Sequence, residues 1–139
     1  MKIQPHDRFS SETTLTPESV ARYAQAVGDT NPVHFDADFA ANTRYRRVIA
    51  SGTQTTALLL GLTAAHFSKG QSMVGLEYWV KFRRPIFADE TIRLEWLVIK
   101  VSPNARLGGH IVDLRGRIKG QDGKTAVGAK GRVLVTDAL

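Results

Sequence analysis

The chain has 139 residues, of which 42% are hydrophobic, and this is typical of one domain with an ordinary core. It contains no cysteine, which excludes disulfide bonds and thiolate chemistry. The formal net charge of +6 favours anionic partners, such as a phosphorylated ligand or nucleic acid. We therefore expect a single domain over residues 1–139.

The N-terminal third of the sequence predicts a strand and two short helices. RFSSETTL is expected to form the strand. TLTPESVARYAQAVGD indicates a helix with Thr16 as N-cap, Pro17 in the first helical position and Gly28 as its stop. Its apolar residues recur at helical spacing on one face: Val20, Tyr23, Ala24 and Val27. A second short helix is expected over Asp36 to Asn42, with Asp36 as its cap.

A longer helix is expected from about Ser51. Ser51 and Gln54 match the capping-box pattern S-x-x-Q. The residues that follow are apolar on nearly every side of a helix: Ala57, Leu58, Leu59, Leu60, Leu62, Ala64 and Ala65. A helix that is apolar all round is buried, so we expect this one at the centre of the domain.

From Met73 onward the pattern changes to strands. LEYWVKF and TIRLEWLVIKV are rich in aromatic and β-branched residues. In HIVDLRGRIKG, apolar or small residues alternate with charged ones, which indicates a sheet with one solvated face. Asp122-Gly123 is a hairpin signal, and TAVGAKGRVLV completes the hairpin. The order of elements indicates an α+β fold, with an antiparallel sheet wrapped around the apolar helix.

Two features of the sequence bear on location and partners. The first ten residues contain no apolar signal segment, and ALLLGLTAA from Ala57, the longest apolar run, is too short to cross a bilayer. We therefore expect a soluble, cytoplasmic protein with no membrane partner. The basic residues are spread along the chain without the aromatic-interleaved pattern of a nucleic-acid-binding module, so we expect no nucleic-acid partner.

The stretch VGDTNPVHFDADFA, which begins at Val27, places Asp29 and His34 five residues apart. Histidine titrates near neutral pH and a carboxylate can take or orient a proton, so the pair can act as general acid and base on one water. Pro32 fixes its own φ and restricts Asn31, which holds this spacing rigid. The structural alternative is that Asp29 caps a neighbouring turn and that His34 is a satisfied, half-buried histidine.

Ser51 and Gly52 stand at the start of the expected long helix. Ser51 is outside any G-x-S-x-G nucleophile motif and is better explained as a helix cap. Gly52 exposes N–H groups at the positive end of the helix dipole, where they can stabilise a developing oxyanion; the alternative is that Gly52 only permits close packing. The spacing of His34 and Asp36 suggests a metal site, but no further ligand follows at a usual spacing, and we expect no metal.

These segments together resemble a known family. G-D-T-N-P-V-H-F-D-A-D-F-A, from Gly28, resembles the hydratase-2 motif of the MaoC-like acyl dehydratases. The resemblance continues through I-A-S-G, which ends at Gly52, through K-F-R-R-P-I-F-A-D-E-T-I from Lys81, and into the final K-G-R-V-L-V strand. It covers most of the chain.

The resemblance implies a hot-dog fold, in which an antiparallel sheet wraps around one long helix, and a homodimer or a dimer of dimers. It implies reversible hydration of trans-2-enoyl thioesters to (R)-3-hydroxyacyl thioesters without a metal or redox cofactor. The thioester is carried by coenzyme A or by an acyl carrier protein. Asp29 and His34 match the catalytic pair, and Gly52 matches the residue whose N–H binds the thioester carbonyl. Asn31 and Pro32 are expected to support the loop.

Two points stay open at the level of sequence. Many family members carry histidine where this chain has Ser51, near the acyl pocket, so the acyl substrate is undecided. The alternatives to a hydratase are a hot-dog thioesterase, with Asp29 activating the water, and a non-catalytic acyl-CoA-binding module, which the intact Asp29–His34 pair disfavours. Clustered basic residues beside the two motifs are expected to include contacts to the CoA phosphates: Arg44, Arg46, Arg47, Lys81, Arg83 and Arg84.

Overall fold

The structure is a computed structural model that describes residues 2–137. Its elements are β1 (Arg8–Thr14), α1 (Pro17–Ala26), η1 (Pro32–His34), α2 (Ala37–Ala41), α3 (Gly52–Phe67), β2 (Ser72–Phe82), β3 (Thr91–Asn104), β4 (Gly109–Lys119) and β5 (Thr125–Thr136). The described residues form one sheet with its helices. Residues 1, 138 and 139, which belong to the expected domain, lie outside the described residues.

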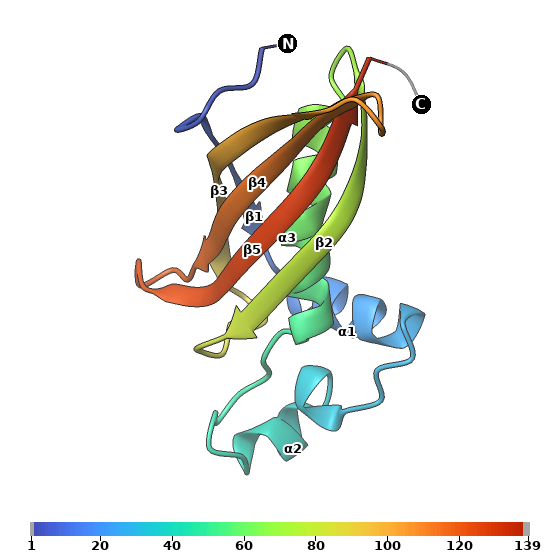
Figure 1. The fold of residues 1–139 in the computed structure, drawn as a ribbon. Helices are drawn as coiled ribbons and strands as arrows, with labels where there is room; N and C mark the ends of the chain where they lie inside the picture. The colour runs from blue at the N-terminus through green and yellow to red at the C-terminus, as the bar shows by residue number, and fades with distance from the viewer. Residues whose placement is uncertain (1, 138–139) are drawn as a thin grey trace.

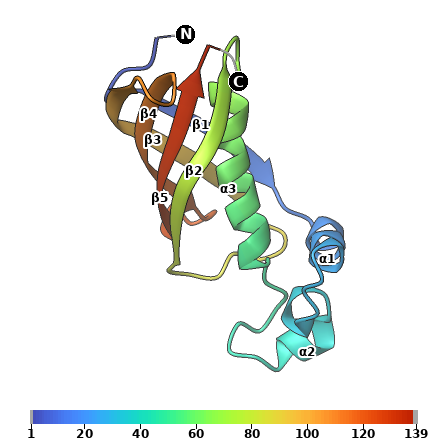
Figure 2. The same cartoon turned by 45° about the vertical axis from the view of Figure 1, so that its right-hand side comes forward.

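The five strands form one antiparallel sheet in the order β1-β3-β4-β5-β2. The long helix α3 lies along one face of this curved sheet, and α1 and α2 lie beyond the N-terminal end of α3 (Figures 1 and 2). Irregular register between Val98 and Lys100 in β3, and between Gly75 and Glu77 in β2, marks bulges of the kind that bend strands. The fold is the expected α+β hot-dog arrangement.

The core forms where the inner face of the sheet meets α3. Trp96 on β3 is 1% exposed, and its indole Nε1–H donates to the backbone carbonyl of Leu59 on α3 at 2.9 Å. Gly116 on β4 makes room for this ring, because a Cβ there would lie 2.5 Å from Trp96 Cε3. The packing of α3 on the sheet is therefore fixed by one large ring and one residue without a side chain.

The N-cap residues of the three α-helices are the ones that the sequence predicted, but the predicted capping box is not found. Thr16, Asp36 and Ser51 are the N-caps of α1, α2 and α3. The expected capping box at Ser51 is wrong, because its Oγ accepts from the N–H of Thr53 at 3.3 Å and the N–H of Gln54 bonds to a backbone carbonyl instead. At Thr16, by contrast, Ser19 closes a capping box that the sequence pattern did not predict.

A smaller part of the surface of α3 is buried than the sequence predicted. Leu59, Thr63 and Phe67 are buried against the sheet, whereas small residues on another face are exposed in the single chain: Ala57, Gly61, Ala64 and Ala65. One chain therefore covers only part of this apolar helix. Within residues 2–137, no helix is long and apolar enough to span a membrane.

Candidate active site

The loop after α1 is held by a short series of backbone and side-chain hydrogen bonds. Gly28 adopts φ +74°, a left-handed conformation that glycine reaches without steric cost. The N–H of Asp29 then donates to the carbonyl of Ala24 at 2.8 Å. Asp29 Oδ1 accepts from the N–H of Asn31 at 3.1 Å, and Asn31 Oδ1 accepts from the N–H of Val33 at 3.3 Å. One carboxylate oxygen of Asp29 thus closes the turn, and Oδ2 is left for other partners.

His34 ends the 3-10 turn η1, which begins at Pro32, and is 7% exposed. Its Nδ1 lies 2.8 Å from the backbone carbonyl oxygen of Ile49. Because a carbonyl oxygen can only accept a hydrogen bond, Nδ1 carries the hydrogen. The other ring nitrogen, Nε2, lies 3.4 Å from Asp29 Oδ2. The Ile49 carbonyl therefore orients the ring so that Nε2 faces the carboxylate.

Ser51 contacts the same carboxylate oxygen. Its side chain is buried, and its Oγ–H donates to Asp29 Oδ2 at 2.9 Å. The N–H of Asn31, the Ser51 hydroxyl and the nearby His34 ring lower the pKa of Asp29 against the opposing effect of partial burial. Asp29 is therefore an anion at neutral pH, held between a hydroxyl and an imidazole. The sequence placed Ser51 beside an acyl pocket and did not indicate this contact.

Gly52 brings the N-terminus of α3 to the wall of a cavity of about 460 Å³, where Ile49, Thr55 and Phe82 also lie. As the first residue of the helix, its N–H has no intrahelical acceptor and lies at the positive end of the helix dipole. A Cβ on Gly52 would lie 2.8 Å from Phe82 Cε1, so a larger residue here would have to displace the exposed Phe82 ring. Asp29 and His34 do not line this cavity. His34 bonds to Ile49, which lines it, and Asp29 bonds to Ser51, which immediately precedes Gly52.

The expected basic residues fall into three groups. Arg44, Arg83 and Arg84 line the cavity that contains Gly52. Arg46 and Lys81 are exposed and line neither this cavity nor its neighbour.

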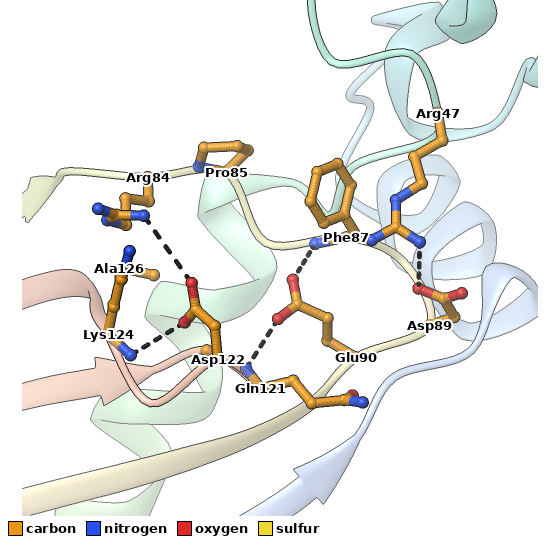
Figure 3. Close-up of a pocket in the computed structure, with 11 residues that line it drawn as sticks. Arg47, Arg84, Pro85, Phe87, Asp89, Glu90, Gln121, Asp122, Lys124 and Ala126 are labelled. Carbon is orange, nitrogen blue, oxygen red and sulfur yellow. Dashed lines mark hydrogen bonds and ion pairs between the residues drawn. The ribbon is translucent and has the colours of Figure 1, made fainter.

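Arg47 lies at the neighbouring cavity of about 500 Å³, which Figure 3 shows. Its guanidinium stacks 3.7 Å above the ring of Phe87 and lies 3.6 Å from Asp89. Arg84 borders both cavities and lies 3.8 Å from Asp122. Both ion pairs are exposed and therefore weak, so a ligand phosphate could compete with the carboxylate for either arginine.

Two parts of the site, and one buried side chain of α3, gave no clear sequence signal. The Ile49 carbonyl is a backbone group, which a side-chain motif does not reveal. Phe82 closes over Gly52 only because of the way β2 packs on α3. Gln54 is buried, and its Oε1 has no hydrogen-bond partner among residues 2–137. In the same residues no group of three or more histidine or acidic side chains is placed to hold a metal.

The comparison with family models supplies the deciding observation, because the model described as "MaoC like domain" matches residues 2–112. The chain belongs to the MaoC-like domain family. It is 32% identical over 76 residues to an (R)-specific enoyl-CoA hydratase of Aeromonas caviae, which is 55% of this chain and 56% of that protein. It is 26% identical over 92 residues to a 3-hydroxybutyryl-CoA dehydratase of Methylorubrum extorquens, which is 66% of this chain and 58% of that protein.

The matches therefore span just over half the length of these curated relatives. A solved structure of the (R)-hydratase from A. caviae involved in PHA biosynthesis superimposes with a TM-score of 0.86 at 25% identity, and covers 95% of this chain and 96% of that one. R-hydratase PhaJ1 from Pseudomonas aeruginosa superimposes with a TM-score of 0.87 at 24% identity, over 97% of this chain and 83% of that one. This chain therefore shares the hot-dog fold of the two solved hydratase structures along nearly its whole length.

Replacing Ser51 with alanine is expected to raise the pKa of Asp29, because the hydroxyl that stabilises its anion is lost. A lowered pKa stabilises the folded state above the ordinary carboxyl pKa, and that contribution disappears as the pH falls through the pKa of the folded state. Ser51→Ala should therefore destabilise more at neutral pH than in acid. The remaining cost, about 1 kcal/mol from the lost helix cap, should not depend on pH.

NMR titration of the Asp29 carboxyl carbon and denaturation at two pH values measure both effects. Thr53→Val is the matched control, because Thr53 Oγ1 also contacts Ser51 Oγ, at 2.7 Å, without touching Asp29. An Asp29 pKa that is the same in Ser51→Ala and in the parent protein contradicts this assignment.

Proposed function

We propose that this protein reversibly adds water to trans-2-enoyl thioesters and forms (R)-3-hydroxyacyl thioesters. The observation that carries the proposal is the convergence of His34 Nε2 and Ser51 Oγ on one oxygen of the Asp29 anion, directly beside the N-terminus of α3. The names of the relatives, a hydratase and a dehydratase, support the same reaction class.

The proposed chemistry uses Asp29 and His34 on one water molecule. The pair removes a proton from the water, and the resulting hydroxide oxygen bonds to C3 of the enoyl group. The C2–C3 double bond breaks as its electron pair moves through C2 to the thioester oxygen. The thioester C=O bond then re-forms, and the electrons of the enolate C1–C2 double bond bind a proton that Asp29 or His34 delivers to C2, which completes the addition of water. Asp29 Oδ2 lies 3.4 Å from His34 Nε2, so one water molecule can contact both groups.

We assign to the N–H of Gly52 the stabilisation of the negative charge that develops on the thioester oxygen. A backbone donor at a helix N-terminus needs no reorganisation when this charge appears, and losing one such donor typically costs about 3–4 kcal/mol of barrier. Water addition transfers no electrons to or from the protein, so the proposed reaction needs no redox cofactor. We propose that it also needs no metal, because the N–H of Gly52 takes the place of a Lewis acid at the thioester oxygen. Arg44, Arg83 and Arg84 share the cavity with Gly52 and are proposed to contact the phosphates of a CoA thioester.

We also propose a homodimer in which two sheets join along β2. Among residues 2–137, the edge strands β1 and β2 each pair with one strand only. The exposed side chains of β1 are polar, whereas Val74 and Leu76 on β2 are 38% and 45% exposed. Pairing along β2 would satisfy its backbone groups and offer cover for the exposed small residues of α3. Sedimentation equilibrium at micromolar concentration should give twice the chain mass, and a monomer there contradicts the proposal.

The decisive assay follows crotonyl-CoA by the absorbance of the conjugated thioester and, separately, by release of free thiol. Hydration removes the absorbance and releases no thiol, whereas a thioesterase releases thiol and a binding module does neither. Asp29→Asn and His34→Ala should each lower turnover by about 10²–10⁴-fold, as positioned acid and base groups do. The double variant should lose little more than the worse single variant, because both groups act on one water.

Two exposed residues give matched controls: Asp38→Asn on α2 and His110→Ala on β4. Both should keep turnover within about twofold of the parent, as expected of surface substitutions. Melting temperatures measured on the same preparations separate a loss of turnover from a loss of folding. If His34→Ala is destabilised by the cavity that it leaves, His34→Gln replaces it in the assay. Near-normal turnover in folded Asp29→Asn protein ends the assignment of this pair.

A further inference from the structure

The outer face of the sheet, opposite α3, carries a hollow that the proposed reaction does not use. Two adjoining cavities of about 600 and 450 Å³ share Trp79, Arg115 and Lys130 in their walls. The larger one is lined from every strand, including Arg8 on β1, Leu97 on β3 and Gly128 on β5. We call these two cavities together the outer groove. Strands lie about 4.8 Å apart, so a groove across five of them extends for about 19 Å.

The charge of the outer groove is strongly positive. Among the described residues, no ion pair neutralises Arg8, Arg115 or Lys130, and Lys130 Nζ lies 5.7 Å from the ring centre of Trp79. The carboxylates on this face are already paired. Glu95 bonds to Arg117 at 2.6 Å and to Arg93 at 3.0 Å. Asp113 and Glu77 both pair with Arg132. The free cations therefore set the sign of the surface.

The groove also reaches the candidate active site. Arg83 follows β2, and a Cβ on Gly128 would lie 3.4 Å from its Nε, so the Arg83 side chain lies over the outer groove. The same residue lines the cavity that contains Gly52. A molecule bound along the outer groove would therefore end at the entrance to that cavity.

Three kinds of occupant can be compared for the outer groove: a second copy of this chain, single-stranded nucleic acid and an acidic helix of another protein. A second copy would bring the same cations face to face, and such like-charge contacts are unfavourable. Single-stranded nucleic acid binds on several stacking rings, whereas the groove offers Trp79 alone, since Trp96 is buried. A row of carboxylates on an α-helix fits the length and the sign of the groove, since about 13 helical residues span 19 Å.

Resting on the proposed function, we propose that the outer groove docks an acidic helix of a protein that carries the thioester substrate on a flexible arm. The cations Arg8, Arg115 and Lys130 pair with its carboxylates, and Trp79, which is 55% exposed, packs against its surface. The arm then passes Arg83 into the cavity at Gly52. The docking surface thus selects a protein-bound acyl group over the same acyl group on free coenzyme A.

The test compares one acyl group on two carriers. The crotonyl group is presented on coenzyme A and on a purified acyl carrier protein, and kcat/KM is measured for each. Arg115→Glu/Lys130→Glu should lower kcat/KM for the carrier-bound substrate by about tenfold or more, because opposite charge accelerates encounter by about that factor. The value for crotonyl-CoA should stay within about twofold. Arg22→Glu/Arg106→Glu, with the same net charge and both changes at exposed residues elsewhere, should leave both values unchanged.

Three kinetic outcomes overturn the proposal: an equal fall with both carriers, no fall with either, or the same selective fall in Arg22→Glu/Arg106→Glu. A second readout is independent of turnover. Trp79 fluorescence should change when carrier protein without an acyl group is added, and the change should vanish in Arg115→Glu/Lys130→Glu protein of unchanged melting temperature. Trp79→Phe identifies the signal against that of buried Trp96.

The fluorescence readout also separates failure of this proposal from failure of the proposed function. If neither crotonyl substrate is hydrated, the reaction is wrong, and the fluorescence titration still decides the docking. A response to a single-stranded oligonucleotide with none to the carrier protein overturns the docking in favour of nucleic acid.

Discussion

The Asp29 carboxylate connects three parts of the molecule that are separate in the sequence. Its Oδ1 closes the loop after α1, and its Oδ2 meets the Ser51 hydroxyl at 2.9 Å and His34 Nε2 at 3.4 Å. Ser51 is also the N-cap of α3. The position of the loop therefore depends on where the long helix begins, and that helix is itself fixed to the sheet by the bond from Trp96 to Leu59. Core packing sets the geometry of the candidate site.

In this arrangement, each side chain of the proposed catalytic pair makes one structural contact and keeps a second polar atom for the proposed chemistry. One oxygen of Asp29 caps a turn, and the other faces the imidazole. Nδ1 of His34 is bonded to the Ile49 carbonyl, and Nε2 faces the carboxylate. Asp29 does cap a turn and His34 is a hydrogen-bonded, buried histidine, as the structural alternative expected. Each side chain nevertheless keeps one polar atom, Oδ2 or Nε2, for the proposed chemistry. A substitution at either position should consequently be judged by both stability and turnover.

The sequence predicted those features that depend on a few neighbouring residues. The caps at Thr16 and Asp36, the hairpin at Gly123 and the alternation along β4 all follow from local backbone chemistry. The contact from Ser51 to Asp29 spans 22 residues, and the one from Ile49 to His34 spans 15. Such contacts depend on how the loop, α3 and the sheet pack together, and no local pattern encodes them.

The burial of α3 shows a second limit of prediction from a local sequence pattern. The apolar pattern predicted a helix covered all round, and the single chain covers only the face that meets the sheet. A pattern reports that a surface is apolar, but it does not report whether the cover comes from the same chain or from another copy. The exposed residues of β2 and α3 are the physical reason for proposing a second copy beside this edge.

The central claim is that Asp29, His34 and the N–H of Gly52 act together on one thioester. A crystal structure of Asp29→Asn with bound 3-hydroxybutyryl-CoA tests it most directly. The account predicts the thioester oxygen about 3 Å from Gly52 N, and the 3-hydroxyl between His34 Nε2 and the amide that replaces the carboxylate. It also predicts the CoA phosphates beside Arg44, Arg83 or Arg84. A thioester oxygen beyond hydrogen-bonding reach of Gly52 N, or a 3-hydroxyl away from His34, contradicts the account.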